Sequence, residues 1–218
     1  MPQFDAVLFD LDGTLLYTLP DIAESLNRAL ESRGYPAHGL EAVRGFVGNG
    51  AARLVARALP GGADNPDYAA VRQAYDRIYA AHACDRTRPY PGVQELLAAL
   101  KRRGIRTGVV TNKADSDAGP MIRRYFPGMV DAVRGKREGC PTKPAPEAAL
   151  AVLAELGCRR DRALLVGDSS VDRETARNAG LACVLVAWGY EDLTDPAPTP
   201  VLGILRRPEE LLSYVDEP

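Results

Sequence analysis

The sequence predicts an α/β fold, with a doubly wound parallel sheet and an all-helical segment inserted near its start. From residue 93 onward, short apolar segments alternate with segments of helical periodicity. This alternation is typical of parallel sheets that carry helices on both faces. Between residues 17 and 86 the periodicity is helical. We therefore expect a core formed by residues 1–16 and 87–218 and a helical domain formed by residues 17–86.

The first expected strand is the apolar run Ala6-Val7-Leu8-Phe9, which is typical of a central strand buried on both faces. Asp10 and Asp12 follow it, and alternate residues of an extended chain point to the same side. Ligands bind open parallel sheets beyond the carboxyl ends of the strands. Two carboxylates crowded there repel each other and require a cation, and their oxygens suit Mg²⁺. A turn with two solvated acids is the alternative, but the apolar run and the following Gly13-Thr14-Leu15 favour the site.

The remaining elements follow from apolar spacing and from glycine and proline residues. The expected helices of the insertion cover residues 20–33, 39–46, 51–59 and 67–83. The expected strands of the core cover residues 105–110, 130–133, 163–166, 182–186 and 202–205. The helices between and after them cover residues 93–103, 116–125, 146–156, 171–179 and 208–214, and a proline-rich loop covers residues 196–200.

Composition excludes several classes of function. The 218 residues carry a formal net charge of −2, so nothing attracts the chain to nucleic acid or to an anionic membrane. We expect neither a signal peptide nor a membrane span, because no apolar run is long enough to cross a bilayer. Four cysteines without a C-x-x-C pair fit a reduced, cytoplasmic protein. The isolated His38 and His82 do not favour a zinc site or a catalytic triad.

Two further expected strand ends carry polar residues suited to binding an anion. Thr111 and Asn112 follow Val109-Val110, and a hydroxyl and an amide can donate to phosphate oxygens. Thr111 could instead cap the next turn. Lys143 lies just before a helix expected to have Pro146 in its first turn, and both a cation and a helix N-terminus favour an anion. A solvated lysine is the alternative.

The run Leu164 to Gly167 is expected to end at the same edge, which directs Asp168 toward the crevice of Asp10. Asp172 falls in the first turn of the next expected helix, three residues after Ser169. That spacing is also typical of a capping box, so a purely structural role for Asp172 stays open.

These motifs, in this order, resemble those of the haloacid dehalogenase superfamily. The similarity begins with Asp10-Leu11-Asp12-Gly13-Thr14-Leu15 and continues through Thr111, Lys143 and the Gly167-to-Asp172 motif, over nearly the whole chain. The resemblance implies a Rossmann-like core with a helical cap between the first and second motifs.

Within that superfamily the chain looks most like the phosphoglycolate phosphatase branch. Gly48-Asn49-Gly50, Tyr90-Pro91-Gly92-Val93 and Thr111-Asn112-Lys113 carry this similarity. Tyr17-Thr18 departs from the Asp-Ser pair often found at that position, which affects the details of substrate choice rather than the chemistry.

The resemblance implies a Mg²⁺-dependent phosphomonoesterase that acts through an aspartyl-phosphate. In this scheme Asp10 is the nucleophile and Asp12 the general acid and base. Asp10, the backbone carbonyl of Asp12 and Asp168 are expected to hold Mg²⁺, with Asp172 in or near the coordination sphere. The expected ligands of the phosphate are Thr111, Asn112 and Lys143.

Substrate choice is expected to come from the cap, where Arg44, Asn49 and Arg53 are candidates for contact. A compact anion such as 2-phosphoglycolate fits two arginines beside a glycine-rich loop, although a solvated cap surface is the alternative. A phosphatase for a sugar phosphate, pyrophosphate or a nucleotide, a phosphomutase like β-phosphoglucomutase, and a non-catalytic phosphate-binding module also remain open. We expect a small phosphorylated metabolite as the partner and a monomer or homodimer.

Overall fold

The computed structural model describes residues 3–193 and 201–216, so the proline-rich stretch expected as a loop lies outside the described residues. The chain divides into two compact units. One contains Met1–Leu16 and Pro89–Pro218, and the other contains Tyr17–Arg88.

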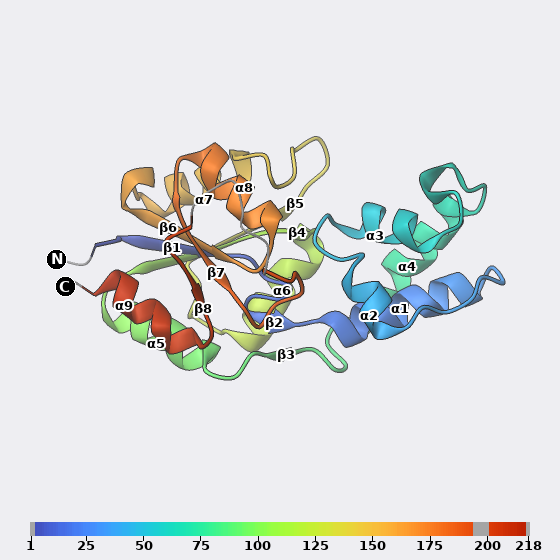
Figure 1. Ribbon diagram of the computed structural model, residues 1–218, viewed down its shortest axis with the longest axis horizontal. Coiled ribbons are helices and arrows are strands. Elements are labelled where there is room, and N and C mark those ends of the chain that lie inside the picture. Colours follow the sequence, from blue (N-terminus) through green and yellow to red (C-terminus); the bar gives the residue numbers. More distant parts are fainter. Residues whose placement is uncertain (1–2, 194–200, 217–218) are drawn as a thin grey trace. The chain divides into compact units, whose positions relative to one another are not determined.

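The larger unit contains a six-stranded parallel sheet with the strand order β5-β4-β1-β6-β7-β8 (Figure 1). The central strand β1 (Ala6–Phe9) pairs with β4 (Arg106–Ala114) on one side and β6 (Ala163–Gly167) on the other. All four residues of β1 are buried, as expected for a continuous apolar run between two layers of helices. The remaining strands are β5 (Ala132–Lys136) at one edge, β7 (Ala182–Val186), and β8 (Gly203–Leu205) at the other edge.

Helices cover both faces of this sheet, which confirms the predicted doubly wound α/β fold. Figure 1 shows α7 (Glu147–Leu156) and α8 (Ser170–Ala179) on one face and α5 (Val93–Arg102) and α9 (Leu212–Val215) on the other. Helix α6 (Asp115–Tyr125) packs against β4 and β5. Two short 3₁₀ helices complete the unit, η2 (Arg160–Arg162) and η3 (Pro208–Leu211). The core beneath α7 and α8 is built from small and branched side chains, among them Ala6, Leu8, Val110, Val152, Leu165 and Ala176.

Predicted boundaries of three elements in this unit, β4, β5 and α7, were wrong. Strand β4 continues to Ala114 rather than ending at residue 110, because a register shift after Val110 lets it pair again with β5 at Lys136. Strand β5 itself occupies residues 132–136 rather than 130–133. We expected Pro146 in the first turn of α7. It is instead the N-cap residue, just before that turn.

The second unit is helical, with α1 (Leu19–Glu31), α2 (Leu40–Arg44), α3 (Ala51–Ala58) and α4 (Tyr68–His82), and a 3₁₀ turn η1 (Gly62–Asp64). Helix α1 packs on α4, and α3 also packs on α4. The stripe of α1 that the sequence marks as apolar is buried, as expected for an amphipathic helix. Its members are Ile22, Leu26, Ala29 and Leu30.

The chain passes between the two units twice, and the sequence analysis missed the short strands that form there. Strand β2 (Leu16–Tyr17) pairs with β3 (Arg88–Pro89) in a two-stranded sheet. Buried Asp21 accepts hydrogen bonds from the backbone N–H groups of Arg86 and Thr87 and from the Thr87 hydroxyl, at 2.8–3.0 Å. A carboxylate at the start of α1 therefore holds the segment that returns from α4.

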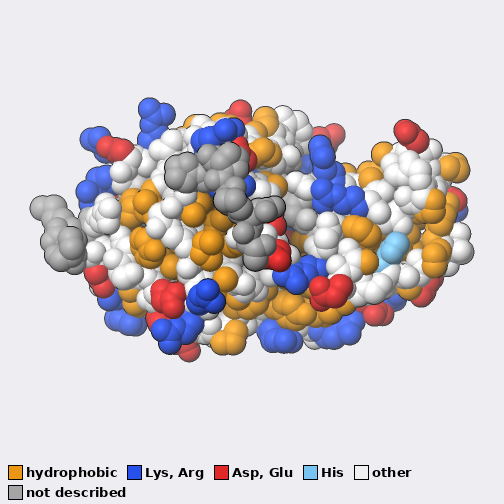
Figure 2. Space-filling model, viewed as in Figure 1, with side chains coloured by type: hydrophobic (Ala, Val, Ile, Leu, Met, Phe, Trp, Pro, Cys, Tyr) orange, Lys and Arg blue, Asp and Glu red, His pale blue; other side chains and the backbone are white. Residues whose placement is uncertain are grey.

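The surface agrees with the low net charge of the chain. Acidic and basic side chains are interspersed over the face shown in Figure 2. Within the described part of the chain, no helix has both the length and the apolar character needed to cross a membrane. The four cysteines, all of them in described positions, are free thiols.

Candidate active site

A cluster of carboxylates lies at the carboxyl edge of the sheet. Asp10 follows β1, Asp168 follows β6, and Asp172 lies in the first turn of α8. One carboxylate oxygen from each of the three residues lies within 4.8 Å of those of the other two. Asp168 and Asp172 are buried, and the Asp10 side chain is 12% exposed. Carboxylates from three separate segments of the sequence therefore meet in one small volume.

Glycine residues make this crowding possible. A methyl group at Gly13 or Gly189 would overlap the Asp168 side chain, and one at Gly167 would overlap Asp172. Gly13 also has a φ of +87°, which glycine adopts without strain. The space that a Cβ atom would fill is thus used by carboxylates.

Two neutral donors hold Asp168. The Thr14 hydroxyl donates to its Oδ1 and the Tyr190 backbone N–H to its Oδ2, both at 2.8 Å. Thr14 lies in the segment that follows β1, and Tyr190 lies in the segment that follows β7. The Asp168 carboxylate is therefore oriented by groups from both sides of β6.

Lys143 joins two of the acids. Its Nζ lies 2.7 Å from Asp10 Oδ1 and 2.6 Å from Asp172 Oδ1. Lys143 is buried, so the alternative of a solvated lysine is wrong. Its loop is held by the Asn112 side-chain amide, which donates to the Lys143 carbonyl at 3.1 Å, and by the Asn178 amide, which donates to the Pro144 carbonyl at 2.8 Å.

Asp172 combines the two roles that the sequence analysis left open. It forms a capping box with Ser169, whose hydroxyl and backbone N–H both donate to Asp172 Oδ2. Its other oxygen, Oδ1, accepts a hydrogen bond from the ammonium of Lys143. The same carboxylate therefore starts helix α8 and fixes the lysine.

The electrostatics of the cluster reflect burial and a surplus of negative charge. Burial raises the pKa of Asp10 to about 6, although Lys143 favours its ionised form. Burial also raises the pKa of Asp168 well above its usual range, and Asp172 and Asp10 add to this effect. For Lys143, burial opposes the charged form, but Asp10 and Asp172 outweigh it and hold its pKa above the usual value. Buried oxygen donors with excess negative charge suit a hard divalent cation.

The second acid of the first motif has a partner of its own. Asp12 Oδ2 lies 2.9 Å from the Nζ of buried Lys113. Asp12 Oδ1 is buried and accepts no hydrogen bond from any described residue. The sequence analysis did not select Lys113 as a site residue. Its position two residues after Thr111 in an extended strand was a usable signal, because such residues share a side.

Thr111 and Asn112 are both buried at the end of β4. The Thr111 hydroxyl accepts the backbone N–H of Lys113 at 3.3 Å, so it does form a local turn-like contact. Asn112 supports the backbone of Lys143 through its side-chain amide. Their expected contacts with phosphate stay predictions.

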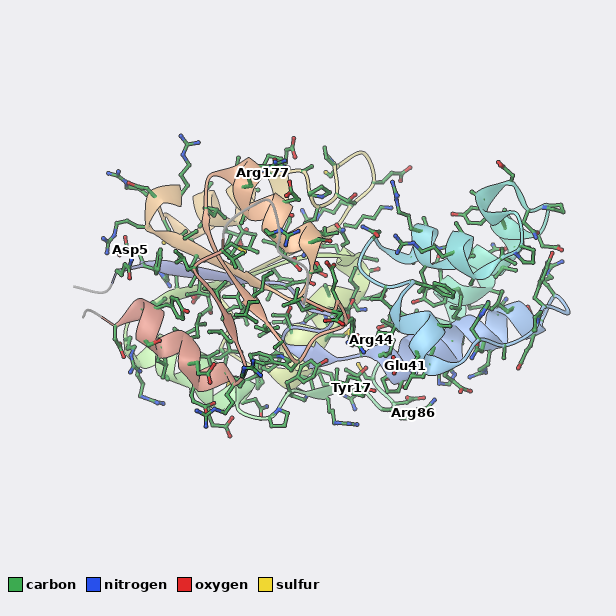
Figure 3. The ribbon with its side chains drawn as sticks, in the orientation of Figure 1. Asp5, Tyr17, Glu41, Arg44, Arg86 and Arg177 are labelled. Atoms are coloured by element: carbon green, nitrogen blue, oxygen red, sulfur yellow. The ribbon has the colours of Figure 1, made fainter. Side chains whose placement is uncertain are left out.

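Two of the three candidate residues of the helical unit, Arg44 and Asn49, contact neighbouring side chains. Glu41 and Arg44 lie together on α2, with 3.5 Å between Oε2 and NH1 (Figure 3). The Asn49 side-chain oxygen accepts a hydrogen bond from Arg57 at 2.7 Å, which the sequence analysis did not foresee. Arg53 is exposed. Substrate contact by Arg44, Asn49 or Arg53 stays a prediction.

Fold and site together define an α/β protein with a carboxylate and lysine cluster at the carboxyl edge of a parallel sheet. The model of the haloacid dehalogenase-like hydrolase family matches residues 7–186, which include every residue of this cluster. The chain belongs to this family of hydrolases, and the resemblance seen in the motifs is confirmed.

Curated relatives of the chain are named as phosphatases. A phosphoglycolate phosphatase of Pseudomonas putida is 40% identical over 189 residues, covering 84% of this chain and 70% of the relative. An N-acetylmuramic acid 6-phosphate phosphatase of Pseudomonas aeruginosa is 36% identical over 220 residues, covering 98% and 96%.

Solved structures share the fold over the whole chain. A protein from Lactobacillus delbrueckii has a TM-score of 0.93 at 28% identity, covering 100% of each chain. A protein from Haemophilus somnus described as a predicted phosphoglycolate phosphatase has a TM-score of 0.89 at 30% identity, covering 98% of each.

Proposed function

We propose that the protein is a Mg²⁺-dependent phosphomonoesterase that acts through a phosphorylated Asp10. The observation that carries this proposal is the buried arrangement of Asp10, Lys143, Asp168 and Asp172, with Asp12 on the same short segment as Asp10. It combines a nucleophile, a cation for the phosphate and a set of hard metal ligands. The phosphatase names of the relatives support the same reaction.

Asp10, Asp168 and Asp172 are the residues that would hold Mg²⁺, with the backbone carbonyl of Asp12 as the further ligand expected from the motif. The donor set fits Mg²⁺, because the oxygens are hard ligands and lie close together. The single positive charge of Lys143 does not balance the charge of the three carboxylates. Bound Mg²⁺ would supply positive charge that offsets the charge of the phosphate and of the carboxylates.

In the first step an Asp10 oxygen attacks phosphorus, and the bond between phosphorus and the ester oxygen breaks. Asp12 donates a proton to the departing oxygen, so the alcohol leaves neutral. Its buried Oδ1, which has no hydrogen-bond partner among the described residues, is the atom suited to this transfer. In the second step water attacks phosphorus, Asp12 takes a proton from it, and the bond between Asp10 and phosphorus breaks.

Lys143 is assigned to the phosphate group throughout. Its ammonium already contacts Asp10 and Asp172, and its third donor can extend to a phosphate oxygen. Thr111 is assigned the same role from the end of β4, and Asn112 holds the backbone of Lys143 as well. These groups stabilise charge that grows on the phosphate oxygens during transfer.

The helical unit is assigned the role of a cap that excludes water and selects the leaving group. Arg44, Asn49 and Arg53 are its candidate contacts. Arg57 supports the loop that carries Asn49, because it donates to the Asn49 side-chain oxygen and also to the Phe46 carbonyl at 2.9 Å. A loop held in this way can present Asn49 in a defined orientation.

The preferred substrate is a compact anionic phosphate ester, with 2-phosphoglycolate as the leading candidate. The name of the Pseudomonas putida relative supports it. A phosphorylated amino sugar is the second candidate, because the N-acetylmuramic acid 6-phosphate phosphatase aligns along 96% of its own length.

The test is phosphate release from a panel of phosphate compounds in the presence of Mg²⁺. The panel contains 2-phosphoglycolate, N-acetylmuramic acid 6-phosphate, glucose 6-phosphate, a nucleoside monophosphate and pyrophosphate. Arg44→Ala and Arg53→Ala are compared with Arg28→Ala, an exposed arginine of α1. A higher kcat/KM for 2-phosphoglycolate than for the other compounds supports the leading candidate, and a higher value for the amino sugar supports the second. Absence of turnover with every compound would refute the phosphatase proposal.

A further inference from the structure

Lys113 is a buried cation of the site that the proposed reaction does not use. Its side chain is 5% exposed and its Nζ lies 2.9 Å from Asp12 Oδ2. The two residues are 101 positions apart in the sequence and are brought together by the pairing of β1 with β4. Burying an ammonium is costly unless it is paired, and Asp12 satisfies that requirement. A lysine that merely filled space could be replaced by an apolar residue, so its charge calls for an explanation.

The position of Lys113 relates it to the leaving group rather than to the phosphate. Asp12 is the residue proposed to protonate the ester oxygen through Oδ1, while Oδ2 contacts Lys113. An ester oxygen that is hydrogen-bonded to Asp12 Oδ1 lies about 2.7–2.8 Å from it. The Asp12 carboxylate then separates this ester oxygen from Lys113 Nζ, with one hydrogen bond on each side. A charged group on the carbon that bears this oxygen falls within reach of the ammonium.

Lys113 is also better defined relative to the reacting groups than the cap arginines are. It belongs to the same compact unit as Asp10, Asp12 and Lys143, and its partner in that unit is known. Arg44 pairs with Glu41 on its own helix, and Arg53 is exposed. A cation next to the general acid suits a substrate whose second negative charge lies close to its phosphate.

We propose that Lys113 forms a carboxylate subsite for phosphate esters that carry a carboxylate on the carbon bearing the ester oxygen. The inference rests on the proposed phosphatase function and assigns part of its specificity to the core. An ammonium is a compact cation that can contact several oxygens at once, and one of its contacts is Asp12 Oδ2, so a substrate carboxylate can approach it beside Asp12. Phosphoglycolate has this chemistry, whereas the carboxylate of an N-acetylmuramic acid 6-phosphate lies far from its phosphate.

The kinetic test compares two substrates that differ only in this group. One is 2-phosphoglycolate and the other is 2-hydroxyethyl phosphate, in which a CH₂OH group replaces the carboxylate. Lys113→Met removes the charge at similar length, and Lys113→Arg retains it. Lys101→Met, at the exposed end of α5, is the matched control. We expect Lys113→Met to lower kcat/KM for 2-phosphoglycolate by about 10- to 100-fold more than for the alcohol, as for loss of a charge-assisted hydrogen bond.

A binding measurement removes the dependence on turnover. The probe is 3-phosphonopropionate, which keeps the shape and charges of 2-phosphoglycolate but has a carbon in place of the ester oxygen. Propylphosphonate, which lacks the carboxylate, is its control ligand. We expect calorimetry to show at least about tenfold weaker binding of 3-phosphonopropionate to Lys113→Met than to wild type, with propylphosphonate little changed.

The outcomes separate the subsite from the proposed function. Wild type that is active on phosphate esters, together with a Lys113→Met variant whose losses are equal for both substrates, would mean that Lys113 acts only through Asp12 and would overturn the inference. An unchanged Lys113→Met variant would overturn it as well. Wild type without any phosphatase activity would refute the proposed function instead. Matching far-ultraviolet circular dichroism spectra below the melting transition show that the folds of the variants are comparable.

Discussion

The ammonium of Lys143 lies 2.6 Å from Asp172 Oδ1, and the two side chains are 3% and 0% exposed. A buried ion pair adds little net stability, but removing one partner leaves an uncompensated charge. We therefore expect Lys143→Met to lower the free energy of unfolding by about 3–5 kcal/mol when metal is chelated. Urea denaturation in the presence of a chelator measures this loss.

The double variant Lys143→Met/Asp172→Asn is the control for that prediction. Removal of the second charge should restore part of the stability but none of the phosphatase activity, because the phosphate would still lack its cation. A double variant no more stable than Lys143→Met would contradict the assignment of the loss to an unpaired Asp172.

Asp10→Asn tests the nucleophile. The amide keeps the shape of the side chain but does not attack phosphorus, so we expect kcat to fall by roughly three orders of magnitude or more. Initial rates with p-nitrophenyl phosphate measure the loss. Asp161→Asn, at an exposed carboxylate paired with Arg159, should leave the rate unchanged. A variant at residue 10 with near-normal turnover would rule out the covalent mechanism.

Asp12→Asn tests the proton transfer. An alkyl ester needs a proton on its departing oxygen, whereas p-nitrophenolate leaves without one. We expect a pre-steady-state burst with p-nitrophenyl phosphate to be slowed much less than the corresponding step with an alkyl phosphate. Equal slowing for both substrates would remove Asp12 from the role of acid.

Metal binding should stabilise the protein as well as activate it. Because Asp10, Asp168 and Asp172 repel one another, Mg²⁺ should raise Tm, and the rise should grow with the logarithm of the Mg²⁺ concentration above Kd. Gly189→Ala should abolish most of this rise, since its methyl group would displace Asp168. Gly39→Ala is the control, because Gly39 has open space around it and an ordinary φ of −66°. Equal Tm shifts in both variants would contradict the proposed ligand set.

The raised pKa of Asp10 predicts a dependence of stability on pH. Its pKa is about 6 in the folded protein and has an ordinary value of 3.8, so the folded state binds the proton more tightly. The contribution of protonated Asp10 to the free energy of unfolding is fully present below pH 3.8 and is lost as the pH rises through about 6. Asp10→Asn does not titrate, so its Tm minus that of wild type should increase between pH 4 and 7 in chelator. A constant or decreasing difference would contradict the raised pKa.

Much of the fold could be predicted because its elements have strong local signals. The apolar run of β1 and the buried stripe of α1 appear where the periodicity placed them. Strand β4 was predicted too short, because Thr111, Asn112 and Lys113 are polar and their pairing depends on a register shift beside β5. The strands β2 and β3 have only two residues each, and no periodic pattern exists at that length.

For the site, the sequence by itself determined which polar groups lie at the carboxyl ends of the strands. Asp10, Asp12 and Asp168 come directly after apolar runs, and parallel strands end at a common edge. Only the tertiary structure decided the partners: Lys113 with Asp12, Lys143 between Asp10 and Asp172, and Asn112 with the Lys143 backbone. Local hydrophobicity sets strands and helices, but a contact between distant residues also depends on strand register and on the path of loops. Neither is encoded in the neighbouring residues, because both follow from the packing of the whole core.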